Sequence, residues 1–282
     1  MLLMPKKLRQ LLLGAANMVV VIALAAGIAA LLGRTLRALP AELLMAAALV
    51  PLYLVGARWI ERRNAVELRL ADLPRGLEEG VLLGAALFSC LMGILWLLDV
   101  YQPSGFGSWR PLAGALLSAF AGAVLEEMIF RGFLFRLVAG LGGNWTALAV
   151  TSALFGLAHL GNHAATLASS AAVTIEAGVL LGAAYAASGS LWLPIGIHAG
   201  WNFAEGSVFG MVVSGHAHRA AWVGGELHGP ALLTGGAFGP EASIAAVVVC
   251  LGAATIYLRK MATMSFSRAP ALSELQDPDP VV

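Results

Sequence analysis

The stretch LEEMIFRGF, residues 125–133, places two carboxylates and a guanidinium inside an otherwise apolar segment. That segment, residues 111–138, is long enough to cross the hydrocarbon core of a bilayer as a helix. Charged side chains at such a depth are costly, so they are usually paired with one another or have a function. Glu126, Glu127 and Arg131 therefore raise two questions: which fold surrounds them, and what they do there.

The composition is that of a membrane protein. Of the 282 residues, 59% are hydrophobic and 12% are charged, about half the charged share of an ordinary soluble domain. The net charge of +1 and the dispersed basic residues give no basis for nucleic-acid binding. Cys90 and Cys250 lie in apolar segments without a second Cys or His at ligand spacing, so neither a disulfide nor a structural zinc site is expected.

Apolar runs of membrane-spanning length predict an all-α, polytopic helical bundle with about eight transmembrane helices. The predicted spans are 11–33, 41–58, 80–99, 111–138, 144–161, 166–188, 190–213 and 241–258. The first follows MPKKLRQ and exceeds the usual length of a signal-peptide core, which favours an uncleaved helix over a signal peptide. Most of the 17 Lys and Arg residues fall on the side that holds the N-terminus, which predicts a cytoplasmic N-terminus. The expected location is a prokaryotic cell membrane.

We expect one integral membrane domain over residues 1–282. Residues 59–79 mix both charge signs with leucines at helical spacing, which suits either a short amphipathic helix on the membrane surface or a solvated loop. The glycine-rich residues 214–240 predict an external loop, and the polar residues 262–282 predict a disordered tail.

The spacing of the polar residues within the spans indicates how they group. Glu127 and Arg131 are four residues apart, in the order that favours an ion pair along one helix. Glu126 lies about 100° further round that helix and is free to face another neighbour. His198, Asn202 and Glu205 share one face of the seventh predicted span.

The depths of these groups are mutually compatible. From the rise per residue of a helix, Glu126 and Glu176 lie roughly 18 Å deep, His159 roughly 22 Å and His198 roughly 12 Å. Taken singly, His159 and Asn202 suit hydrogen bonds between helices, and Glu127 with Arg131 suits a structural pair. Together, a carboxylate, two imidazoles and an amide can activate water and stabilise an oxyanion. Glu176 and Glu205 are predicted as accessory residues that line the same cavity.

Three motifs carry a resemblance to a known family. The segments EEMIFR (126–131), FGLAH (155–159) and HAGWN (198–202) fit the patterns EExxxR, FxxxH and HxxxN, in that order and on successive apolar segments. The chain thereby resembles the CPBP family of CAAX-processing and bacteriocin-processing intramembrane endopeptidases, also called Abi proteins, over a catalytic core of residues 110–210. The resemblance implies hydrolysis of a peptide bond in a membrane-associated protein or peptide, within the lipid bilayer.

The resemblance also implies roles for individual residues. Glu126 and His159 would activate the attacking water, and His198 and Asn202 would stabilise the oxyanion. Glu127, Arg131 and Phe155 would support them.

The residues leave the cofactor open between none and zinc. Glu126, His159 and His198 are one carboxylate and two imidazoles, a set that catalytic zinc accepts. The absence of an HExxH helix favours a metal-free glutamate mechanism.

The residues also leave an alternative function: a non-catalytic membrane scaffold or transporter that uses the buried polar cluster for binding. Other classes of intramembrane protease fit less well, because no GxSxG run occurs and Asp99 is the one aspartate near a predicted span. The sequence carries no signal for the identity of the substrate or for the oligomeric state.

Overall fold

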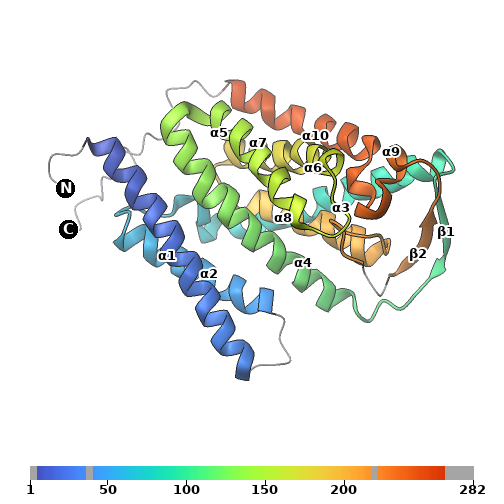
Figure 1. The fold of residues 1–282 in the computed structure, drawn as a ribbon, viewed down its shortest axis with the longest axis horizontal. Helices are drawn as coiled ribbons and strands as arrows, with labels where there is room; N and C mark the ends of the chain where they lie inside the picture. The colour runs from blue at the N-terminus through green and yellow to red at the C-terminus, as the bar shows by residue number, and fades with distance from the viewer. Residues whose placement is uncertain (1–4, 36–40, 218–220, 264–282) are drawn as a thin grey trace.

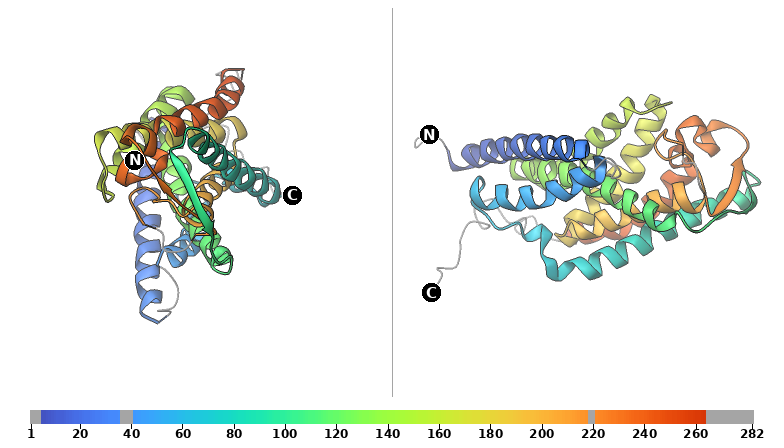
Figure 2. Two further views of the ribbon diagram at one scale, coloured as in Figure 1. Left: turned by 90° about the vertical axis from the view of Figure 1, so that its right-hand side faces the viewer. Right: turned by 90° about the horizontal axis from the view of Figure 1, so that it is seen from below.

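The computed structural model describes residues 5–35, 41–217 and 221–263. Over these residues the chain is a bundle of helices with one small sheet (Figures 1 and 2). The α-helices are α1 (Lys6–Thr35), α2 (Ala41–Trp59), α3 (Leu73–Leu97), α4 (Leu112–Glu127), α5 (Arg136–Ala158), α6 (Leu167–Val173), α7 (Leu180–Ser188), α8 (Trp192–Phe203), α9 (Ala231–Thr234) and α10 (Ile244–Thr263). The predicted fold class, a polytopic helical membrane protein, is confirmed.

All eight predicted spans are helical over most of their length, but their boundaries differ from the prediction. Among the described residues, six helices are long and apolar enough to cross a membrane. One of them, Leu112–Gly161, contains two predicted spans and turns at Gly143, whose φ is 80° and ψ is 175°. The predicted span 190–213 is helical only from Trp192 to Val208, which makes it too short to be counted with the six.

Three helical segments are π-helical: η3 (Met128–Phe135), η5 (Thr174–Val179) and η6 (Ala204–Val208). The first follows the EE pair directly, and the third follows Asn202 by one residue. π-helical turns are frequent at functional sites because they change the direction in which side chains point.

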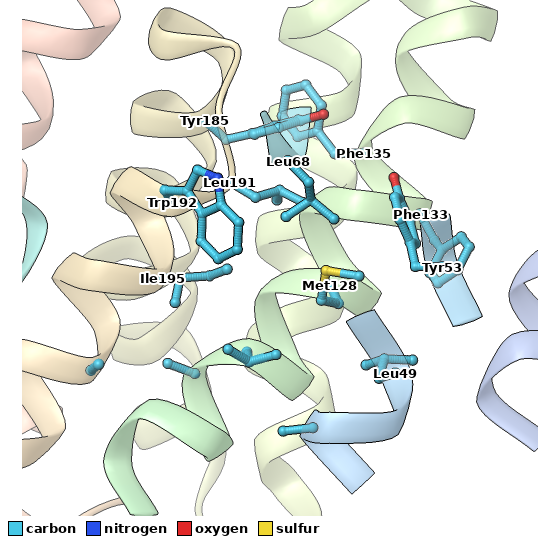
Figure 3. Packing of buried hydrophobic residues seen from close by; sticks show 14 of the residues in the cluster. Leu49, Tyr53, Leu68, Met128, Phe133, Phe135, Tyr185, Leu191, Trp192 and Ile195 are labelled. Carbon is cyan, nitrogen blue, oxygen red and sulfur yellow. The ribbon is translucent and has the colours of Figure 1, made fainter. Parts of the chain in front are cut away.

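A hydrophobic core joins α2, η3 and α8. Tyr53 of α2 packs edge to face on Phe133 of η3, with ring centroids 4.7 Å apart. Trp192 and Ile195 of α8 belong to the same buried cluster (Figure 3). These contacts fix the segment that follows the EE pair against two neighbouring helices.

Glycines bring α3 and α8 into close contact. A Cβ atom added to Gly84 would lie 2.0 Å from the backbone oxygen of Ile197, and one added to Gly200 would lie 2.3 Å from the backbone oxygen of Val81. Small residues allow such close approach of helix backbones within membranes. This contact places α8, and with it His198, at a fixed height beside α3.

The two-stranded sheet was not predicted. Strand β1 (Tyr101–Phe106) pairs antiparallel with β2 (Val223–Leu227), at the opposite end of the molecule from α1 and α2 (Figures 1 and 2). The predicted external loop 214–240 thus contains β2, the short helix α9 and tight turns. The predicted disordered tail lies outside the described residues, except for residues 262–263, which end α10.

No amphipathic surface helix forms over residues 59–79, and the loop between α2 and α3 is exposed only in part. Two 3₁₀ turns, η1 (Val66–Leu68) and η2 (Leu70–Asp72), lead directly into α3, so no surface helix forms. Glu61, Arg63 and Glu67 are buried. They enter what we call the anchoring network, a buried set of hydrogen-bonded side chains from α1, α2, the 60–68 segment and α5. Its members are Asn17, Tyr53, Glu61, Arg63, Glu67 and Arg136.

Every carboxylate oxygen of the anchoring network has a donor. Glu61 accepts from Arg63 Nε at 2.7 Å, from Arg136 Nη2 at 2.5 Å and from Asn17 Nδ2 at 2.6 Å. Glu67 accepts from Arg63 Nη1 at its Oε2 atom, at 3.1 Å, and from the Tyr53 hydroxyl at its Oε1 atom. Burial opposes ionisation of Glu61, but the attraction of Arg136 and Arg63 outweighs it and lowers its pKa to about 2. The sequence periodicity of residues 59–79 suggested amphipathicity because it could not show that these charges are neutralised by Arg136 of a distant helix.

Candidate functional site

The predicted ion pair of the first motif is present. Arg131 Nη1 donates to Glu127 Oε1 at 2.7 Å, and both side chains are fully buried. Arg131 Nη2 also donates to the backbone oxygens of Ala177 and Gly178, at 3.3 and 3.2 Å. The pair therefore ties the end of α4 to η5.

Glu127 has a second partner. The same Oε1 atom lies 3.0 Å from His198 Nδ1 on α8. A carboxylate that is already paired with an arginine accepts hydrogen bonds, so the hydrogen between the two groups belongs to Nδ1. Glu127 thus orients the His198 ring and leaves its Nε2 atom to face elsewhere.

His159 is oriented by the backbone of its own helix. Its Nδ1 atom lies 2.7 Å from the backbone oxygen of Phe155, which can only accept, so Nδ1 carries the hydrogen. The Phe155 ring lies 4.7 Å from the His159 ring and 6.1 Å from the His198 ring, and the Arg131 guanidinium stacks on it at 4.6 Å. The FxxxH spacing therefore supplies both a backbone acceptor and an aromatic wall for the two imidazoles.

Glu126 stands between the two imidazoles. Its Oε2 atom lies 3.9 Å from Nε2 of His159 and 3.9 Å from Nε2 of His198. That oxygen is buried and has no hydrogen-bond partner. The prediction that the first glutamate is left free to face another neighbour matches this geometry.

Between Glu126 Oε2 and His159 Nε2, these contacts leave two hydrogen-bond acceptors without a donor. With Nδ1–H directed to Phe155, the neutral ring of His159 presents a bare Nε2 to Glu126, and both atoms are acceptors. A separation of 3.9 Å is too long for a hydrogen bond. Acceptors that face one another in this way are satisfied by a group that lies between them and donates to both, such as water.

A cavity opens beside the two imidazoles, and Glu126 is not among the residues that line it. His159, His198 and Asn202 line it, and so does Glu176, which the sequence placed among the accessory residues. Glu205 is fully buried and lies against Glu241 rather than among the lining residues. The cavity therefore brings together motif residues from α5, α8 and the 3₁₀ turn at His159–Gly161.

Sequence reasoning missed Glu241 and Ser214, which also line the cavity. The Ser214 hydroxyl donates to Glu241 Oε1 at 2.7 Å, and Glu241 is 3% exposed. Glu241 is the first residue of a predicted span, where a charge normally reaches the membrane surface. The glycine-rich segment before it folds back onto the bundle, for example through the Gly215 N–H that donates to the Phe238 oxygen at 2.7 Å, and this carries Glu241 inward.

Glu126, His159 and His198, the three residues considered as zinc ligands from the sequence, are not positioned to bind a zinc ion in this structure. Among the described residues, no group of three or more His, Cys, Asp or Glu side chains is arranged to hold a metal ion. Ligand atoms of tetrahedral zinc lie about 3.4 Å apart, whereas Glu126 Oε2 is 3.9 Å from each imidazole nitrogen.

Comparison with known proteins gives one family. Residues 108–204 match the family described as "Type II CAAX prenyl endopeptidase Rce1-like". The match covers about a third of the chain, includes all three motifs, and ends before Glu205 and Glu241. No curated protein and no solved structure matches the chain. The predicted resemblance to the CPBP family is confirmed over these residues.

Proposed function

We propose that this membrane protein, whose residues 108–204 match the Rce1-like family of the CPBP type, is an intramembrane endopeptidase. It hydrolyses a peptide bond of a membrane-associated protein or peptide. The family match supports peptidase activity in general. The observation that carries the catalytic assignment is the buried, unpartnered Oε2 atom of Glu126, 3.9 Å from two imidazole nitrogens at the edge of a cavity.

Glu126 and His159 activate the water. A water molecule between Glu126 Oε2 and His159 Nε2 donates one hydrogen to each, which leaves its oxygen lone pairs free to attack a substrate carbonyl. As the C–O bond forms, a proton passes from the water to Glu126. Glu126 then delivers this proton to the leaving amine, so that the C–N bond breaks and the carboxylate is restored.

His198 and Asn202 stabilise the oxyanion. Because Nδ1–H of His198 is held by Glu127, the ring can donate to an oxyanion only through a protonated Nε2. Glu127 accepts at Nδ1, and the Glu126 carboxylate lies 3.9 Å from Nε2, close enough to favour a positive charge on the ring without a hydrogen bond to it. The oxyanion donor is therefore a cationic His198, rather than the neutral imidazole considered from the sequence, and Asn202 adds an amide N–H.

The first test uses the purified full-length chain in lipid nanodiscs and a mixture of short peptides, with cleaved bonds read by mass spectrometry. Glu126→Gln and His159→Ala should each lower cleavage by about 10²–10⁴-fold, the usual range for loss of a general base. Glu226→Gln, a control on the exposed side of β2, should cleave like the unaltered chain. Full activity of either active-site variant would overturn the assignment. Flux of ions or solutes through proteoliposomes without any cleavage would favour the transporter alternative.

The second test concerns zinc. The metal-free mechanism predicts that chelation with 1,10-phenanthroline, followed by its removal, leaves cleavage unchanged and that the purified protein holds far less than one zinc per chain. Stoichiometric zinc, with activity lost on its removal and restored on its return, would replace the direct glutamate mechanism by a metal-bound water.

A further inference from the structure

Three buried carboxyl groups gather beside the cavity, apart from the three motifs. Glu176 of η5 and Glu241 of the turn before α10 line the cavity, and Glu205 of η6 lies behind Glu241. Their exposed fractions are 3%, 3% and 0%. Residues far apart in the sequence thus form one acidic wall, which we define as Glu176, Glu205 and Glu241.

Among the described residues, no lysine or arginine forms an ion pair with the acidic wall. Glu241 accepts from the Ser214 hydroxyl, and Glu176 Oε2 accepts from the Cys250 thiol at 3.6 Å. Both oxygens of Glu205 are buried, and the residue they lie against is another carboxylic acid, Glu241, rather than a cation. Within the described residues, every ion pair of an arginine involves another glutamate, namely Glu61, Glu67, Glu79 or Glu127.

The acidic wall is suited to bind a positively charged ligand. Three carboxylates at close range in a low-dielectric site cannot all ionise unless a cation joins them. Because Glu176 and Glu241 face the cavity, a cation can reach them from it. The remaining walls include Val173, Leu180 and Ile197, which suit the alkyl stem of a long basic side chain.

We propose that the acidic wall is a substrate subsite that recognises a lysine or arginine side chain close to the scissile bond. The proposal rests on the proposed endopeptidase function and names the substrate class: peptides with a basic residue flanking the bond that is cut. Glu241, His159 and His198 line the same cavity, so a basic side chain held at Glu241 shares that cavity with the reacting groups.

The test compares lysine with norleucine, which keeps the alkyl stem without the charge. Peptide mixtures carry one or the other at each position in turn, and the full-length chain in nanodiscs is assayed for cleavage. The unaltered chain should prefer lysine by about tenfold or more at one position beside the cut bond, as expected for a paired buried charge. Glu241→Gln and Glu176→Gln should each lose most of this preference while still cutting the norleucine peptides. Glu226→Gln should retain it.

A binding measurement separates this proposal from the proposed function. The Glu126→Gln chain, immobilised in nanodiscs, should retain lysine peptides over norleucine peptides, and the added Glu241→Gln change should remove that enrichment. If the unaltered chain cuts no peptide, the endopeptidase function fails while the binding result still decides the subsite. Equal retention of both peptides, or equal loss of cleavage of both in Glu241→Gln, would overturn the subsite. Thermal unfolding shows whether each variant is folded. If Glu241→Gln does not fold, the same comparison of lysine and norleucine peptides is made with Glu176→Gln.

Discussion

Two buried ionic clusters lie in this molecule, and they differ in how completely their charges are satisfied. In the anchoring network, all four carboxylate oxygens of Glu61 and Glu67 meet donors from Arg63, Asn17, Tyr53 or Arg136. In the candidate catalytic cluster, which comprises Glu126, Glu127, Arg131, His159 and His198, neither Oε2 of Glu126 nor Oε2 of Glu127 meets a donor, and the former also faces both imidazole Nε2 atoms. A satisfied cluster holds helices together, whereas an acceptor left open beside a cavity is available for a reaction.

Glu127 both neutralises the buried Arg131 and orients His198, so its removal should have the largest effect. Glu127→Gln leaves Arg131 buried without a countercharge, which typically costs about 3–5 kcal/mol of stability. It also removes the carboxylate that orients His198, so cleavage by the folded fraction should fall as well. Thermal unfolding in nanodiscs and cleavage per folded molecule measure the two effects separately. Unchanged cleavage per folded molecule would show that Glu127 acts only as a structural partner.

The anchoring network should affect stability alone. Arg63→Met leaves Glu61 and Glu67 with fewer partners and should lower the free energy of unfolding by about 3–5 kcal/mol. Cleavage per folded molecule should stay unchanged. Arg75→Met is the matched control, because Arg75 and Glu79 form an exposed ion pair whose loss should change stability far less. If Arg63→Met and Arg75→Met were equally stable, the network would not anchor the fold.

Acid should weaken the anchoring network over a defined window. Folding lowers the pKa of Glu61 from 4.5 to about 2, so the folded state binds its proton less readily than the unfolded state. The resulting stability, up to about 3 kcal/mol, is fully present above pH 4.5 and is lost as the pH falls toward 2. The fall in unfolding temperature between these pH values should be smaller in Glu61→Gln than in the unaltered chain. An identical fall in both would contradict the lowered pKa.

The sequence predicted the parts of the structure that depend on local periodicity. Apolar runs predicted the helices, and the spacing of Glu127 and Arg131 predicted their ion pair, because both follow from the geometry of one helix. The same reasoning left Glu126 free, and the structure places it 3.9 Å from two imidazoles on other segments.

Features that join distant segments could not be predicted in this way. The pairing of β1 with β2 and the burial of Glu241 both depend on how residues 214–240 fold back onto the bundle. Residues 59–79 were misinterpreted for the same reason, since the arginine that neutralises Glu61 comes from α5. Local periodicity gives no information about which distant charge meets a buried one.

The most direct test of this contrast compares Glu126→Gln with Glu61→Gln in the same nanodisc preparation, measuring peptide cleavage per folded molecule and unfolding temperature for each. We expect Glu126→Gln to lose cleavage and keep its unfolding temperature, because no donor in the fold depends on Oε2. Glu61→Gln should lose stability and keep cleavage, because Arg63 and Arg136 both depend on its charge. Cleavage at the unaltered rate by Glu126→Gln would contradict the account.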